Sequence, residues 1–184
     1  MNNKVNSPTK FQSCTLLLDF DKTLAIRDIS DDYIVKLYTE FQRNPSNLNR
    51  AALKRAVFGS DKRINEILIP LLSINRVEYI IISANIKYYI EQVLEASNLR
   101  IYFRYIYGSV DEKGKFVKRR FKGKLDRVVF VDDYQKYIDQ MKSVLPIENI
   151  FKVPRPKNKQ LGIQKPLLYR LLKKIHNLTN NKNG

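Results

Sequence analysis

Histidine and cysteine, which serve most often as transition-metal ligands and in nucleophile–base pairs, are almost absent from this sequence. The chain of 184 residues has one cysteine, Cys14, and one histidine, His176. A single cysteine allows no disulfide within the chain and no zinc site built on cysteines. His176 falls in a helix predicted near the C-terminus, where we interpret it as structural. Ser-His-Asp and Cys-His mechanisms are therefore excluded.

Long apolar runs and glycine-rich phosphate loops are also lacking. No apolar run approaches the roughly 18 residues that can span a bilayer, and residues 1–12 lack the apolar segment of a signal peptide. The pattern GxxxxGK[ST] is absent, which disfavours a Walker-type nucleotide triphosphatase. We therefore expect no integral membrane segment, a cytoplasmic location and a disordered lead-in over residues 1–12.

Positive charge is abundant. Lysine and arginine number 34 against 18 acidic residues, so the formal net charge is +16. Such an excess favours anionic partners, namely nucleic acid, an anionic membrane or phosphorylated substrates. The alternative is a lysine- and asparagine-rich composition without a specific partner.

Apolar runs that alternate with helical patterns predict the fold. We expect buried strands over residues 14–19, 77–83, 101–108, 127–133 and 150–153, and helices over 31–43, 47–58, 61–73, 84–97, 135–144 and from Pro166 onward. This alternation predicts a doubly wound α/β fold with a mostly parallel sheet. We expect one domain over residues 13–176 with a small helical cap inserted at about 28–58, followed by a flexible tail over 177–184.

Polar side chains follow three of the predicted strands at the point where each strand ends. Asp19 and Asp21 follow the run Leu16 to Leu18, Ser83 follows VEYIII, and Asp132 and Asp133 close RVVFVDD. A parallel sheet brings such ends to one edge, where ligands bind. Carboxylates held close together repel unless a cation joins them, and oxygen ligands without histidine or cysteine suit Mg²⁺.

These motifs resemble those of the haloacid dehalogenase (HAD) superfamily. The segment from Asp19 to Leu24, DFDKTL, fits the first motif, DxDx[TV]; Ser83 fits the second, and Asp132 with Asp133 fits the acidic fourth. The resemblance covers roughly residues 14–153 and implies a Rossmann-like core with phosphatase activity, since members with an aspartate at the position of Asp21 are typically phosphatases or phosphotransferases.

The resemblance also implies a role for each matching residue. Asp19 would attack phosphorus, and Asp21 would act as general acid and base. Mg²⁺ would be held by Asp19, by the main-chain carbonyl of Asp21 and by Asp132. Ser83 and a lysine would hold the phosphoryl oxygens, with Thr23 bracing the loop or touching the phosphate. Asp133 is expected beyond the direct ligands, or as a helix cap.

The lysine of the third motif has more than one candidate. Lys113 is the first choice, because Lys113-Gly114 would open a helix before the acidic strand. If Val110 to Val117 instead formed a hairpin around Lys113-Gly114, the lysine would be Lys118, Lys122 or Lys124.

The resemblance implies a phosphomonoester substrate, and the small insertion suggests an open active site. A nucleic-acid end, a nucleotide and a phosphoprotein all fit this expectation. A nucleic-acid partner would be favoured by the basic groups Lys118-Arg119-Arg120, Lys122, Lys124, Arg155, Lys157 and Lys159. The aromatic residues Tyr102, Phe103, Tyr105 and Tyr107 either stack on bases or pack in the core. The alternative function is a catalytically idle module that binds nucleic acid or another anionic partner.

Overall fold

A parallel sheet of five strands forms the centre of the molecule. The computed structural model describes residues 13–27, 31–58, 62–155 and 162–180. The strand order is β5-β4-β1-β6-β7, with every pair parallel. The strands are β1 (Cys14–Leu18), β4 (Val77–Ile82), β5 (Phe103–Tyr107), β6 (Val128–Asp132) and β7 (Ile150–Lys152). After β1 the chain adds β4 and β5 on one side, then β6 and β7 on the other, which confirms the doubly wound α/β fold.

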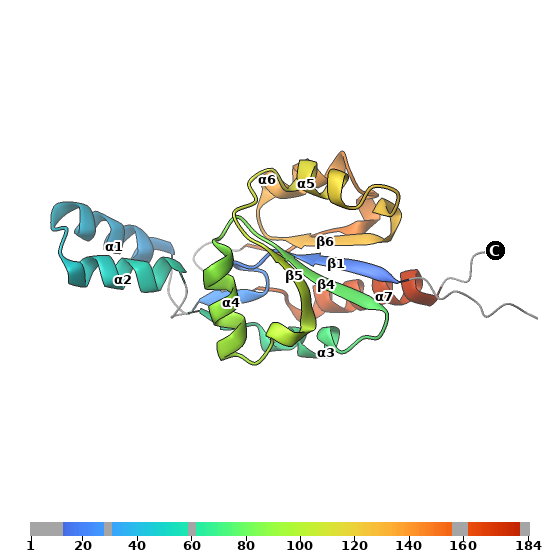
Figure 1. Cartoon of the computed structure of the whole chain (residues 1–184), viewed down its shortest axis with the longest axis horizontal. Helices are drawn as coiled ribbons and strands as arrows, with labels where there is room; N and C mark the ends of the chain where they lie inside the picture. Colours follow the sequence, from blue (N-terminus) through green and yellow to red (C-terminus); the bar gives the residue numbers. More distant parts are fainter. Residues whose placement is uncertain (1–12, 28–30, 59–61, 156–161, 181–184) are drawn as a thin grey trace, which may run out of the picture.

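Helices cover both faces of the sheet, as the continuous apolar strands require. Alternate residues of β1 point to opposite faces, because Leu16 and Leu18 belong to one apolar cluster and Leu17 to the other. One face is covered by α3 (Ile69–Leu72), α4 (Lys87–Ala96) and α7 (Lys165–Asn180), and the other by α5 (Lys113–Arg120) and α6 (Gln135–Lys142) (Figure 1). None of the helices in the described ranges is both long and apolar enough to cross a membrane.

Two helices are inserted in the sequence between β1 and the next strand of the sheet, β4. They are α1 (Asp31–Arg43) and α2 (Asn47–Phe58), with the predicted bounds, and in Figure 1 they extend together away from the sheet. Ser46 caps the start of α2, since its Oγ accepts a hydrogen bond from the Asn49 N–H at 3.1 Å. The two short strands β2 (Ala25–Arg27) and β3 (Lys62–Ile64) pair in antiparallel fashion and bring the ends of this segment together.

The prediction of one helix over residues 61–73 was wrong. Within its described part, residues 62–64 form β3, residues Glu66–Leu68 form a 3₁₀ turn, and α3 starts only at Ile69. Pairing with β2 outweighs the helical spacing of the apolar residues, and the Asn65 N–H continues this connection by donating to the Leu24 carbonyl at 2.9 Å. Pro70 lies in the first turn of α3, where its missing N–H costs nothing, so it starts a helix instead of kinking one.

The remaining differences concern ends of elements. The segment from Arg100 to Tyr102 is a 3₁₀ turn, and the predicted strand begins at Phe103. The last helix continues to Asn180, past the predicted end near Asn177, and buries Thr179. Further 3₁₀ turns precede β6 (Leu125–Arg127) and β7 (Ile147–Asn149). The predicted disordered lead-in, residues 181–184 of the tail, and Lys157 and Lys159 lie outside the described residues.

Candidate active site

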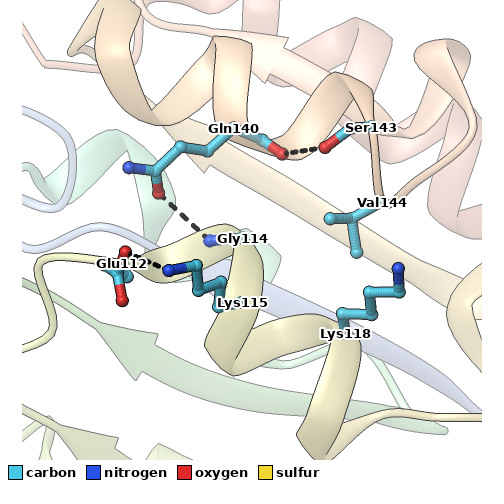
Figure 2. A pocket seen from close by; sticks show the side chains of 7 residues that line it. All are labelled: Glu112, Gly114, Lys115, Lys118, Gln140, Ser143 and Val144. Atoms are coloured by element: carbon cyan, nitrogen blue, oxygen red, sulfur yellow. Dashed lines mark hydrogen bonds and ion pairs between the residues drawn. The ribbon is translucent and has the colours of Figure 1, made fainter.

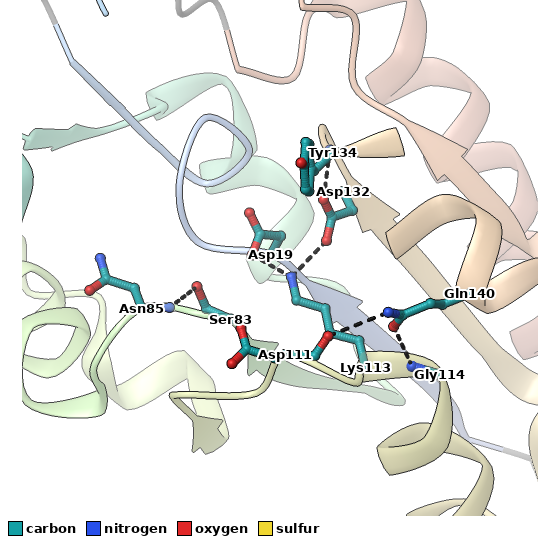
Figure 3. Close-up of polar contacts among 9 residues, drawn as sticks. All are labelled: Asp19, Ser83, Asn85, Asp111, Lys113, Gly114, Asp132, Tyr134 and Gln140. Atoms are coloured by element: carbon teal, nitrogen blue, oxygen red, sulfur yellow. Dashed lines mark hydrogen bonds and ion pairs between the residues drawn. The ribbon is translucent and has the colours of Figure 1, made fainter. Parts of the chain in front are cut away.

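The polar strand ends predicted from the sequence meet at one edge of the sheet. β1 is the central strand, with β4 and β6 as its neighbours. Asp19 extends the pairing beyond β1, because its N–H donates to the Val131 carbonyl at 2.9 Å. Ser83 does the same beyond β4, where its N–H donates to the Tyr107 carbonyl at 2.9 Å. Asp132 is the last residue of β6, so the three side chains are presented together (Figure 3).

Lys113 joins two of the carboxylates. Its Nζ lies 2.6 Å from Asp19 Oδ1 and 2.7 Å from Asp132 Oδ2, and the lysine side chain is 0% exposed. Figure 3 shows the lysine reaching between the two aspartates from the start of α5. The ring of Tyr137 covers the ammonium group, with its centroid 4.2 Å from Nζ. The structure therefore has the helix and not the hairpin at Lys113-Gly114.

The other candidate lysines lie elsewhere. Lys118 points into a pocket of about 310 Å³ between α5 and α6, where Gly114 N–H donates to Gln140 Oε1 at 3.1 Å (Figure 2). A Cβ at Gly114 would lie 2.9 Å from the Gln140 carbonyl oxygen, so this close approach of the two helices requires glycine. Lys122 and Lys124 line a groove formed by residues at the starts of the strands.

Burial dominates the electrostatics of these groups. Loss of hydration raises the pKa of Asp19 to about 7, although the charge of Lys113 opposes this shift. Burial likewise raises the pKa of Asp132, again against the attraction of Lys113. For Lys113, burial alone would lower the pKa, but the attraction of Asp19 and Asp132 outweighs it and the pKa rises. One ammonium is thus shared by two buried carboxylates.

A third carboxylate completes a group that fits a metal ion. Oxygen atoms of Asp19, Asp132 and Asp133 all lie within 4.8 Å of one another, and all three residues are buried. Burial, together with repulsion from Asp19, raises the pKa of Asp133 to about 6, although Arg155 lies 3.4 Å from its Oδ2. Excess negative charge and oxygen-only ligands fit a hard divalent cation such as Mg²⁺.

Asp133 is a stronger candidate ligand than the sequence suggested. Both oxygens of Asp132 already accept hydrogen bonds, Oδ2 from Lys113 and Oδ1 from the Tyr134 N–H at 2.8 Å. The side chain of Asp21 is not part of the three-carboxylate group. The expected contribution of Asp21 to a metal is its main-chain carbonyl, which the same loop carries.

Asp21 is instead held by a residue for which the sequence suggested no such role. Asn85 Nδ2 donates to Asp21 Oδ2 at 3.0 Å. The Asn85 main-chain N–H donates to Ser83 Oγ at 3.1 Å (Figure 3). Asn85 therefore links the loop after β1 to the loop after β4. We expected it only as a helix start, and its spacing of two residues from Ser83 is the one signal in the sequence that could have indicated this role.

The loop after β1 is tightly folded. Lys22 has a φ of 59°, and the Leu24 and Ala25 N–H groups both donate to the Phe20 carbonyl, at 3.1 and 2.7 Å. Thr23 is 0% exposed. Its Oγ1 has no hydrogen-bond partner within residues 13–27, 31–58, 62–155 and 162–180. A buried hydroxyl without a partner is energetically unfavourable. The Thr23 hydroxyl therefore either binds a ligand or destabilises the folded state.

Comparison with known proteins finds a family model that covers most of the chain. A family model described as NLI interacting factor-like phosphatase matches residues 14–180, which include every candidate residue above. No curated protein sequence matches the chain significantly.

Solved structures of low sequence identity share the fold. A haloacid dehalogenase-like family hydrolase from Streptococcus pneumoniae is 14% identical, with a TM-score of 0.58 over 86% of this chain and 90% of that chain. A HAD-superfamily hydrolase from Ehrlichia chaffeensis is 17% identical, with a TM-score of 0.57 over 92% and 99%. The N-terminal part of a Bacteroides fragilis protein, which contains a phosphatase domain complexed with Mg, is 16% identical, with a TM-score of 0.52 over 95% and 43%. At these identities the likeness concerns the HAD-like fold.

Proposed function

The chain belongs to the NLI interacting factor-like phosphatase family, and we propose that it hydrolyses phosphomonoesters with Mg²⁺ through a phosphorylated Asp19. The observation that carries this proposal is the contact of one buried lysine, Lys113, with both Asp19 and Asp132 at the carboxyl edge of the sheet. Such a lysine holds the nucleophile in place and offers positive charge to the phosphoryl oxygens.

The chemistry divides into two steps that share one proton carrier. In the first, a carboxylate oxygen of Asp19 attacks phosphorus and the ester P–O bond breaks, while Asp21 gives its proton to the leaving oxygen. In the second, Asp21 takes a proton from a water molecule, whose oxygen attacks phosphorus and releases inorganic phosphate with the Asp19 carboxylate. The hydrogen bond from Asn85 holds the Asp21 side chain for both steps.

The metal site would be formed by Asp19, Asp133, Asp132 and the main-chain carbonyl of Asp21. When bound, Mg²⁺ supplies positive charge that offsets repulsion between the nucleophile and the phosphoryl group. The Bacteroides fragilis structure, which contains a phosphatase domain of similar fold complexed with Mg, supports the choice of Mg²⁺ as the cation. The Ser83 hydroxyl and Lys113 would hold the phosphoryl oxygens, and Thr23 would brace the loop that carries Asp21.

The substrate class is proposed from the surroundings of the site. The inserted helices α1 and α2 are short and extend away from the sheet, which suits an open site and a phosphate carried on a large molecule (Figure 1). We propose a cytoplasmic location and three classes of substrate to compare: a nucleic-acid end, a nucleotide and a phosphoprotein.

Hydrolysis of para-nitrophenyl phosphate tests the proposal directly. We expect Mg²⁺-dependent turnover that is lost in excess EDTA, and a loss of at least about 1,000-fold in kcat for Asp19→Asn, which keeps the shape but removes the nucleophile. Asp139→Asn is the matched control, because Asp139 is exposed on α6 and pairs with Lys142 at 2.7 Å. Equal rates for wild type and Asp19→Asn would leave only the idle binding module.

A further inference from the structure

A second depression lies at the other end of the same sheet. It is a groove of about 850 Å³ whose lining includes Thr15, Val77, Arg104 and Arg127, at or beside the starts of β1, β4, β5 and β6. Thr15 precedes Asp19 by four residues of extended chain, which places the groove roughly 13 Å from the candidate nucleophile. A ligand in this groove would not occupy the active site.

Cations dominate the groove. Four of its basic side chains are available to a ligand at the surface: Arg104, Arg120, Lys122 and Lys124. The carboxylates in the lining are Glu78 and Asp126, and Glu78 lies 3.2 Å from Arg104. The fifth cation, Arg127, has a structural role, because its guanidinium donates to the main-chain carbonyls of Ser13 and Leu178.

Two of the arginines are arranged on aromatic rings. The guanidinium carbons of Arg104 and Arg120 lie 5.5 and 5.7 Å from the centroid of the Tyr105 ring. Tyr105 is stacked on Tyr107 at 5.9 Å with an interplanar angle of 21°, and Arg120 Nε donates to the Tyr107 hydroxyl at 3.2 Å. These contacts hold the guanidinium groups at the surface, where planar groups can stack on them.

The four cations come from three segments that line the groove. Arg104 comes from β5, Arg120 from the end of α5, and Lys122 and Lys124 from the turn that follows. Gly123 separates these two lysines with a φ of 80°, and the Lys124 N–H closes the turn by donating to the Phe121 carbonyl at 3.0 Å. Four cations in one groove of about 850 Å³ match a polymer with repeated negative charges better than a single phosphate ion.

We propose that this groove binds single-stranded nucleic acid, with its phosphates on the four cations and its bases on the two arginine planes. Stacking on planar side chains combined with a basic groove is the usual means of binding single strands without sequence preference. An acidic peptide would use the charges but not the planes. The proposal goes beyond the phosphatase activity and is independent of it, since the groove and the catalytic edge lie at opposite ends of the strands.

Fluorescence anisotropy with a labelled 12-nucleotide single strand without a terminal phosphate tests the proposal. The experiment compares wild type with a groove variant that carries Arg104→Gln, Arg120→Gln, Lys122→Gln and Lys124→Gln. The matched control replaces four exposed lysines outside the groove by glutamine, namely Lys36, Lys54, Lys165 and Lys173. Each variant lowers the formal net charge of +16 by the same four units.

We expect the groove variant to bind at least about tenfold more weakly and the control to bind within about threefold of wild type. Absence of wild-type binding at 50 mM salt, or equal losses in the two variants, would overturn the proposal. Unchanged melting temperature and para-nitrophenyl phosphate turnover in both variants show that the fold and the active site are intact.

Two further probes separate nucleic acid from other ligands. A strand of abasic sites with the same number of phosphates should bind wild type more weakly, because it cannot stack on the arginines. A polyglutamate peptide of equal charge should compete poorly. Equal binding of either probe would refute the assignment to nucleic acid. Displacement of the strand by inorganic phosphate at a concentration that only saturates the active site would place it there instead of in the groove.

Discussion

The two ends of the central sheet carry opposite charge and differ in burial. At the carboxyl end, Asp19, Asp132 and Asp133 are buried around Lys113. At the amino end, Arg104 and the turn after α5 expose cations to solvent. The helix α5 joins the two ends, because it begins at Lys113 and finishes at Arg120. A parallel sheet can thus keep a desolvated site and a solvated surface apart within one small domain.

This difference in burial determines how large the effect of a substitution is. A charge removed from a buried group leaves its partner without hydration, which costs about 3–5 kcal/mol. An exposed cation pairs weakly and is screened by salt, so its removal costs below about 1 kcal/mol. A single substitution at the carboxyl end should therefore have a large effect. At the amino end each substitution should have a small effect, and the total should grow with the number of substitutions.

Lys113→Met is the substitution with the largest expected effect on stability. It removes the ammonium from Asp19 and Asp132 while keeping much of the side-chain volume. We expect the free energy of unfolding in EDTA to fall by about 3 kcal/mol or more, measured by urea denaturation at pH 8.

The pH dependence of that loss tests its cause. Burial raises the pKa of Asp19 to about 7, well above its value in the unfolded chain, and removal of Lys113 raises it further. A raised pKa gives stability that is present at low pH and is lost as the pH rises through the folded-state value. The destabilisation should therefore be smaller at pH 5 than at pH 8. Lys115→Met on the same helix, where the side chain is 80% exposed, should change stability by less than about 0.5 kcal/mol at both.

Asn85→Ala should have the next largest effect. It removes the hydrogen bond to Asp21 Oδ2 but leaves the main-chain contact with Ser83. If Asn85 positions the general acid, kcat/KM should fall by about tenfold for alkyl phosphates and by less than about threefold for para-nitrophenyl phosphate, whose leaving group needs no proton. The measurement is the dependence of kcat/KM on leaving-group pKa. The same loss for every leaving group would show that Asn85 has only a structural role.

The sequence predicted the buried end well because strand ends are a local signal. Apolar runs that stop at Asp19, Ser83 and Asp132 placed these residues together once a parallel sheet was assumed. The choice of Lys113 over the hairpin alternatives stayed open, because it depends on the close packing of Gly114 against Gln140 on another helix. Asn85 was missed for the same reason, since its partner Asp21 lies 64 residues away.

The amino end was less predictable. The aromatic residues of β5 were expected either to stack on bases or to pack in the core. The structure shows the packing, because Tyr105 and Tyr107 lie partly buried against the core and Arg104 lies over the Tyr105 ring. Strand β3 was missed because pairing with β2, and not local propensity, decides its conformation. The segment that decides the conformation of β3 is therefore distant in sequence.

Thr23→Val tests whether the buried hydroxyl of Thr23 destabilises the fold at the carboxyl end of the sheet. The valine has nearly the shape of threonine but lacks the hydroxyl, whose Oγ1 has no hydrogen-bond partner in the described part of the chain. We expect the free energy of unfolding to rise by about 1 kcal/mol in urea denaturation. Turnover of para-nitrophenyl phosphate should stay within about threefold of wild type if Thr23 braces the loop. A stability loss instead would mean that the hydroxyl is hydrated or bonded in solution.

Lys122→Gln has the smallest expected effect and represents the solvated end. Lys122 is exposed in the turn after α5, so one of four similar cations is lost while the groove keeps its shape. Affinity for the single strand should fall by only about twofold to threefold, and the slope of log affinity against log salt should become shallower by about 0.7. Hydrolysis should not change, since the catalytic edge is at the far end of the strands.

Lys36→Gln is the control for this prediction, because it removes the same charge from α1 and should leave the slope of log affinity against log salt unaltered. A change in turnover for Lys122→Gln without one for Lys36→Gln would show that α5 couples the two ends, and the separation of the two regions would then be incorrect.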